Sequence, residues 1–194
     1  MTMRQNEIEQ VVNRVLADFH ITASPFSHIK QLCTHEEIII KKAKFSPTVD
    51  GAFAVLKGDK YLFYNPSMPD GRQNFTKAHE LGHYFLKHSL ENGKIVCSPQ
   101  NIFENERVGL PQIEKEANLF AVYFLMPEPM IRAEFFKVAN IFIPNLNCPL
   151  YVDNQPCNLK YWKLLSRHLV SHFGVSKEAL GYRLDNLGLI KYNF

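Results

Sequence analysis

Residues 76–85 read Thr-Lys-Ala-His-Glu-Leu-Gly-His-Tyr-Phe and contain the pattern His-Glu-x-x-His, with His79 and His83 four positions apart. On an α-helix, side chains at positions i and i+4 lie one above the other, with Cβ atoms about 5–6 Å apart. Both imidazoles can therefore reach one metal ion at the usual Zn–N distance of about 2.0–2.1 Å. Glu80 points to the side of this pair, where its carboxylate can act as a general base on a metal-bound water.

The sequence around this motif has the periodicity of an amphipathic helix. Apolar or small residues recur at helical spacing: Phe75, Ala78, Leu81, Gly82, Phe85 and Leu86. Glycine costs about 1 kcal/mol relative to alanine inside a helix, so Gly82 suggests that another backbone or a metal shell comes close. The alternative interpretation is an ordinary helix with two surface histidines, because the short motif alone carries a false-positive risk.

A catalytic zinc site of this kind needs a third protein ligand and leaves the fourth position to water. We expect the third ligand on a second helix, residues 112–126, whose apolar face comprises Ala117, Phe120, Ala121, Phe124 and Leu125. At about 100° per residue, Glu114 lies roughly 50° from the centre of this face and Glu116 roughly 110° away. Glu114 is therefore the predicted ligand, and Glu116, which we expect to face solvent, is the alternative.

Two further interpretations concern the same helix. Glu114 could instead be a carboxylate placed at the N-terminal end of the helix, where the helix dipole favours it. Asn118 lies one turn after Glu114 on the same face. Its side chain could hold a ligand histidine by a hydrogen bond outside the metal shell.

These elements carry a resemblance to a known family. Residues 75–83, Phe-Thr-Lys-Ala-His-Glu-Leu-Gly-His, look like the zinc helix of the ImmA/IrrE metallo-endopeptidases. Residues 114–127, Glu-Lys-Glu-Ala-Asn-Leu-Phe-Ala-Val-Tyr-Phe-Leu-Met-Pro, are similar to the family signature Glu-x-x-Ala-Asn-x-Phe-Ala-x-x-Leu-Leu-Met-Pro. Residues 165–190 resemble its usual helical end. The matches cover most of residues 49–190 and are more specific than the zinc motif alone.

The resemblance implies a gluzincin-like zinc protease with His79, His83 and Glu114 as ligands and Glu80 as base. It implies a protein substrate, typically a DNA-bound helix-turn-helix transcriptional repressor of a mobile element or stress regulon, which is cut once. Mn²⁺ could substitute for Zn²⁺. Two other hypotheses stay open: a different zinc hydrolase with the same ligands, and a catalytically silent repressor- or toxin-binding module with a retained metal site. The intact Glu80 argues against the second.

Composition and charge limit the remaining function classes. A length of 194 residues with 46% apolar and 12% aromatic residues predicts one domain, or one with a small appendage, around a real core. The net charge of +3 is too weak to indicate direct DNA binding or a membrane surface. No apolar run reaches the length of a membrane span, and the first residues are polar, so we expect a cytoplasmic protein. The four cysteines, Cys33, Cys97, Cys148 and Cys157, are expected to be free thiols.

The expected fold class is α+β and zincin-like, with a small antiparallel or mixed sheet packed on helices that include the His-Glu-x-x-His helix. An apolar stripe predicts an N-terminal helix: Ile8, Val11, Val12, Val15, Leu16 and Phe19. The pattern also predicts a short helix at 26–33 and strands at 37–45, 52–57 and 60–65, with Gly58-Asp59 as the tight turn of a hairpin. An edge strand of this sheet could pair with an extended substrate.

Two predictions concern the segment after the metal helix. His88 lies five residues after His83, about 140° round the helix, and is therefore expected to face away from the metal. Residues 89–111 have mixed polarity with scattered glycine and proline, which predicts a long loop near the site.

The chain is predicted to divide into three parts. Residues 1–139 form the zincin-like domain, 140–157 an irregular insertion rich in proline and asparagine, and 158–194 a C-terminal helical segment, similar to a helix-turn-helix, that packs on it. Ser176 is a natural N-cap for its last helix. Without a basic face, this helical pair is expected to close the core more than to dock on DNA or a repressor. His168 and His172, four positions apart, are taken as structural residues.

Overall fold

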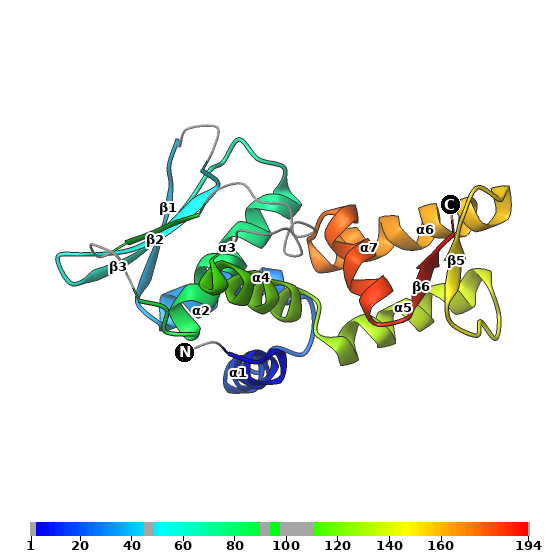
Figure 1. The fold of residues 1–194 in the computed structure, drawn as a ribbon, viewed down its shortest axis with the longest axis horizontal. Coiled ribbons are helices and arrows are strands. Elements are labelled where there is room, and N and C mark those ends of the chain that lie inside the picture. The colour runs from blue at the N-terminus through cyan, green and yellow to red at the C-terminus, as the bar shows by residue number, and fades with distance from the viewer. Residues whose placement is uncertain (1–2, 45–48, 90–93, 98–110, 194) are drawn as a thin grey trace.

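The computed structural model describes residues 3–44, 49–89, 94–97 and 111–193. Two groups of elements lie at opposite ends of an elongated molecule (Figure 1). A four-stranded sheet and the first four α-helices form one group, and three later helices with a two-stranded sheet form the other. The helix with the His-Glu-x-x-His motif packs against the larger sheet. This arrangement confirms the expected α+β class with a helical C-terminal part.

The larger sheet is mixed and has the strand order β1-β3-β2-β4. Its strands are β1 (Ile38–Lys42), β2 (Gly51–Leu56), β3 (Asp59–Tyr64) and β4 (Lys94–Cys97). β1 runs parallel to β3, whereas β2 runs antiparallel to both β3 and β4. The hairpin turn is Lys57-Gly58, with φ of 54° and 94°, and Asp59 already belongs to β3. The predicted Gly58-Asp59 turn is therefore displaced by one residue.

The strand β4 lies within the segment predicted to be a single loop, residues 89–111. It pairs antiparallel with β2, and Cys97 stands opposite Gly51 in the register. Four residues are too few for a periodic pattern to identify a strand. The strand forms through its pairing with β2, which the local sequence does not predict. The rest of the predicted loop, 90–93 and 98–110, lies outside the described residues.

The helices of this first group match the predicted ones closely. They are α1 (Gln5–Asp18), a 3₁₀ turn η1 (Pro25–His28), α2 (Ile29–His35), α3 (Asp70–Phe85) and α4 (Gln112–Leu125). Four members of the predicted N-terminal stripe are buried: Ile8, Val12, Val15 and Leu16. α1 packs against α4, and α4 packs against α3. The helix α4 is therefore covered from two sides, as Figure 1 also shows.

The close approach expected at Gly82 is between helices α3 and α4. A Cβ atom at Gly82 would lie 3.1 Å from the Cα and the carbonyl oxygen of Ala117 and from the Cβ of Phe120. A larger side chain would push the two helices apart. Glycine at this position thus sets the distance between the helix that carries the histidines and the helix that carries the third candidate ligand.

The second group of elements is mostly helical. It comprises α5 (Glu128–Phe142), β5 (Leu150–Val152), α6 (Pro156–Phe173), α7 (Lys177–Asn186) and β6 (Ile190–Tyr192), with β5 parallel to β6. The Oγ of Ser176 accepts a hydrogen bond from the backbone N–H of Ala179 at 3.1 Å, which confirms the predicted N-cap. α5 continues to Phe142 and β5 lies within residues 140–157, so that segment is partly regular. The predicted three-part division of the chain stays a prediction.

The cysteine thiols and the character of the helices can be compared with the sequence predictions. Cys33 is a buried free thiol, whereas Cys148 and Cys157 are exposed free thiols. Across the described parts of the chain, no helix combines the length and the apolar character needed to cross a membrane.

Candidate metal centre

Helices α3 and α4 bring three potential ligand side chains together. Nε2 of His79 lies 3.2 Å from Oε2 of Glu114, and Nε2 of His83 lies 3.4 Å from Oε1 of the same carboxylate. The two Nε2 atoms are 3.0 Å apart. Ligands of a tetrahedral ion at about 2.0–2.1 Å are separated by about 3.3–3.4 Å, and the separations between these donors are close to that value. The group can hold a metal ion, with the fourth corner left for water or substrate.

Asn118 orients the first histidine, at the place where the sequence suggested it would. Its Oδ1 lies 2.8 Å from Nδ1 of His79 in the buried interior. An amide oxygen only accepts hydrogen bonds, so Nδ1 of His79 carries the proton and donates it. Nε2 of His79 is then the ring atom with a lone pair, and it faces Glu114. This is the tautomer that a metal ligand requires.

His88 lies directly beside His83, so the prediction that it faces away is wrong. Its Nδ1 is 2.8 Å from Nδ1 of His83. The prediction extended the helix past its real end: α3 stops at Phe85, and Lys87 has a positive φ of 56°. The chain turns back at this point, and the rotation of 100° per residue no longer applies.

Glu116 is also misplaced by the sequence argument. It was expected to face solvent, but it is only 2% exposed. Its Oε2 lies 3.2 Å from Nε2 of His88, and its Oε1 accepts from the backbone N–H of Met3 at 2.8 Å and from Gln112 at 3.0 Å. The helix α4 is covered by α1 as well as by α3. The angles of Glu114 and Glu116 were measured from a single apolar face, so they do not predict burial on a second side of the helix.

These contacts fix the protons along a chain from Glu116 to the centre. A carboxylate accepts, so Nε2 of His88 donates to Glu116, and Nδ1 of His88 is then the acceptor for Nδ1–H of His83. Nε2 of His83 therefore also presents a lone pair. Two imidazole lone pairs that face each other at 3.0 Å need a positive charge between them, which a metal ion supplies.

The electrostatics of His83 and His88 agree with this assignment of neutral rings. Burial, followed by the nearby His79 and His88, lowers the pKa of His83 to about 2, so this ring is neutral at physiological pH. Burial also lowers the pKa of His88, although Glu116 acts in the opposite direction. Burial lowers the pKa of His79 as well, but Glu114 and Glu80 outweigh this effect and raise it. The negative potential that raises this pKa also favours a bound cation.

Glu80 is fully buried, at 0% exposure. It follows His79 on α3 and lies close to Gly51, the first residue of β2. A Cβ atom at Gly51 would lie 2.9 Å from Oε1 of Glu80 and 2.5 Å from the methyl carbon of Thr76. The strand β2 can approach the carboxylate this closely because Gly51 has no side chain. A buried carboxylate is costly unless a positive charge is near, and a metal ion held by the three donors would lie close to it.

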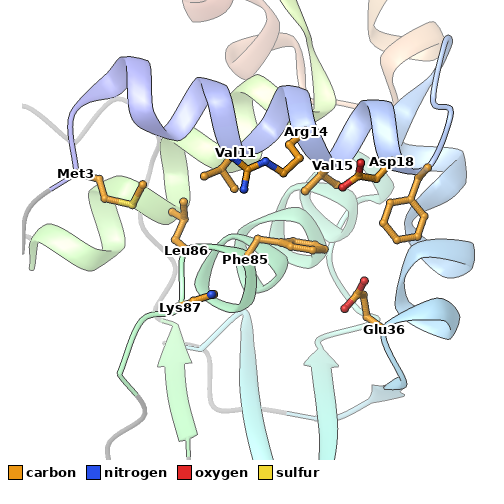
Figure 2. A pocket seen from close by; sticks show the side chains of 10 residues that line it. Met3, Val11, Arg14, Val15, Asp18, Glu36, Phe85, Leu86 and Lys87 are labelled. Atoms are coloured by element: carbon orange, nitrogen blue, oxygen red, sulfur yellow. The ribbon is translucent and has the colours of Figure 1, made fainter.

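A separate pocket lies between α1 and the C-terminal end of α3 and has a volume of about 410 Å³ (Figure 2). Val11 and Val15 of α1 face Phe85 and Leu86 across it, with Lys87 at its edge. None of His79, His83, Glu114 or Glu80 lines this pocket. It is therefore separate from the cluster of ligand atoms and belongs to the packing of α1.

The fold and the site together define a metal-dependent peptidase of the His-Glu-x-x-His class. A family model described as the IrrE N-terminal-like domain matches residues 33–147, which is more than half of the chain and includes the whole motif, residues 79–83, and the third ligand candidate, Glu114. The chain therefore belongs to the ImmA/IrrE family of metallopeptidases. Comparison with curated proteins finds no match.

Proposed function

We propose that this metallopeptidase is a zinc-dependent endopeptidase that cuts one peptide bond in a specific protein, a helix-turn-helix transcriptional repressor of a mobile element or stress regulon. The observation that carries the proposal is the convergence of three donor side chains next to a fully buried carboxylate: the Nε2 atoms of His79 and His83 are 3.0 Å apart, and each lies 3.2 or 3.4 Å from one of the two oxygens of Glu114. In this proposal His79, His83 and Glu114 hold the metal, Glu80 is the general base, and Asn118 orients His79.

The ligand set favours zinc among the common ions. Two imidazole nitrogens and one carboxylate oxygen with an open fourth position are typical of catalytic zinc sites. Mn²⁺ prefers a shell richer in oxygen but could replace zinc here. When bound, the ion would polarise the scissile carbonyl and make the attacking water more acidic.

Glu80 then moves the proton of the reaction. Its carboxylate takes the proton from the attacking water and gives it to the amine of the leaving peptide. The burial of Glu80 keeps bulk water from competing for that proton. The relay from His83 through His88 to Glu116 holds one ligand ring in a single orientation during this cycle.

The open edge of β4 supports an extended protein substrate. Among the described strands β4 pairs only with β2, and its end residue Cys97 lies opposite Gly51, which touches Glu80. A substrate strand added to β4 would lie one strand spacing, about 4.8 Å, further on. Backbone hydrogen bonds along this edge would hold the peptide near the base. The repressor identity itself rests on the family resemblance.

The test is to purify the full chain and the Glu80→Gln variant, measure zinc in each, and incubate each with the repressor-like protein encoded beside it. Both proteins should retain zinc, because Glu80 is not a ligand, and only the wild type should cut. The fragment termini would then give the cleavage site. Retained zinc with no cleavage of any candidate repressor would favour a catalytically silent binding module instead.

A further inference from the structure

A second cluster of histidines and a carboxylate lies in the helical part of the chain, away from the centre described above. Glu134 lies on α5, and His168 and His172 lie one turn apart on α6, which packs against α5. Nε2 of His168 is 2.7 Å from Oε1 of Glu134, and Nδ1 of His172 is 4.0 Å from the same atom. The three donor atoms all lie within 4.8 Å of one another.

The burial and charge of Glu134 require positive partners. The residue is only 8% exposed, and its ion-pair partners in the described part of the chain are Lys137, His168 and His172. Lys137 donates to both of its oxygens, at 3.0 and 3.2 Å. The Lys137 side chain is 70% exposed, so its ammonium group can move into solvent at little cost. A cation that is held by the two imidazoles can take its place.

We propose that Glu134, His168 and His172 form a second Zn²⁺ site, which links α5 to α6. Two imidazole nitrogens and one carboxylate oxygen are the same kinds of donor as in the centre on α3 and α4, and a histidine pair at i and i+4 presents both rings on one helix face. The side chain of His168 is 47% exposed, so the fourth position is open to water. Small rotations of this exposed ring and of His172 bring the donors to the separation of about 3.3–3.4 Å that a zinc shell needs.

Only Glu134 lies in the matched family region, because His168 and His172 lie beyond residue 147. The sequence alone predicts that His168 and His172 are structural, because no glutamate comes directly after His168 as Glu80 does after His79. The missing third donor comes from another helix. The competing explanation is a plain ion pair between Glu134 and its histidine and lysine neighbours, which would bind no zinc.

The experiment uses the full chain with its accessible thiols alkylated, so that no exposed cysteine binds zinc, and with one equivalent of Zn²⁺ already bound. Calorimetric titration with further Zn²⁺ should reveal a second equivalent in the wild type. His168→Gln and His172→Gln should each lose it while keeping the first equivalent and the far-ultraviolet circular dichroism of the wild type. Glutamine at position 168 can still donate to Glu134, so the ion-pair geometry is largely preserved.

Two further variants sharpen the result. Lys137→Ala should bind the second equivalent more tightly, because the ammonium group no longer competes for Glu134. His35→Gln is the matched control: His35 is an exposed histidine 3.3 Å from Glu36 but lacks a second imidazole, so its loss should change nothing. The second equivalent should also raise the unfolding temperature of the wild type and of His35→Gln, but not of the two glutamine variants at 168 and 172.

A wild-type chain that binds only one equivalent after alkylation would overturn the proposal. So would His168→Gln and His172→Gln variants that bind the second equivalent as the wild type does. If Lys137→Ala left the affinity unchanged while the histidine variants also bound normally, the cluster would be an ion pair and nothing more.

Discussion

The Nδ1 atoms of His83 and His88 lie 2.8 Å apart, and this contact joins the metal centre to the buried carboxylate of Glu116. It exists because α3 ends at Phe85 and the chain turns back on itself. One ligand ring is thereby held by a histidine that lies outside the helix of the motif. The orientation of His83, and with it the affinity for metal, depends on this short return of the chain.

Replacement of His88 should weaken metal binding without removing a ligand. In His88→Ala the Nδ1–H of His83 loses its acceptor, and we expect a fall in metal affinity of about 10–100-fold, the usual effect of losing such a partner. Competition with a chromophoric chelator measures the change. His35→Ala, a substitution of an exposed histidine that is not among the three ligand candidates, is the control. Equal affinities for His88→Ala and this control would contradict the relay.

Asn118 offers a matched pair of substitutions at the other ligand. Asn118→Ala removes the acceptor for Nδ1–H of His79, so metal affinity should fall by about tenfold or more. Asn118→Asp keeps an accepting oxygen and should keep most of the affinity. The same chelator competition measures both variants. If the alanine variant bound metal as tightly as the aspartate variant, Asn118 would only fill space.

Gly51→Ala tests the contact between β2 and Glu80, the proposed general base. The new Cβ would lie 2.5 Å from Thr76, 2.9 Å from Glu80 and 2.9 Å from the carbonyl oxygen of Phe63, so the strand or the carboxylate must move. We expect a loss of about 1–3 kcal/mol in the free energy of unfolding, as in other overpacked cores. Urea denaturation measures this loss.

The same substitution should displace Glu80 and reduce cleavage more than the loss of stability explains. Val55→Ala, toward the other end of β2, provides the comparison: it removes packing but leaves Glu80 in place. Activity that fell equally in both variants would show that Gly51 has no special relation to the base.

Cys33 should behave differently from the two exposed thiols. Burial, the largest effect, raises the pKa of Cys33 from 9.0 to about 12. At pH 8, iodoacetamide should label Cys148 and Cys157 and leave Cys33 unmodified in the folded chain, as peptide mass spectrometry would reveal. Rapid labelling of Cys33 would mean that its surroundings are open to solvent.

The same shift makes a prediction for stability against pH. Between pH 9 and about 12 the unfolded chain loses the Cys33 proton while the folded chain keeps it. The stabilisation from this group is therefore fully present below pH 9 and is lost as the pH rises through that window. Cys33→Ala should show a shallower loss of stability over the same range in urea titrations.

Local periodicity was enough to predict the part of the site that lies on two helices. His79, His83, Glu114 and Asn118 each take their place from rotation along α3 or α4, and the amphipathic patterns give that rotation directly. These four side chains come together when the apolar face of α3 packs on the apolar face of α4. The close contact at Gly82 was readable for the same reason, because glycine inside a helix is otherwise unfavourable.

Most of the features that the sequence missed depend on contacts between distant segments, and one depends on where a helix ends. The burial of Glu116 depends on α1 and Met3, more than a hundred residues away, and the place of His88 depends on where α3 ends. The strand β4 exists because β2 offers it an edge. Glu134 meets His168 through the packing of α5 on α6, which no local pattern encodes.

The central claim is that His79, His83 and Glu114 hold one zinc ion beside Glu80. Anomalous diffraction at the zinc absorption edge, from crystals of the full chain grown with zinc, tests it most directly. We expect a strong peak within about 2.0–2.2 Å of both Nε2 atoms and of a Glu114 oxygen, with Glu80 outside the shell. A folded chain with no peak there, or with Glu116 in place of Glu114 as the ligand, would contradict it.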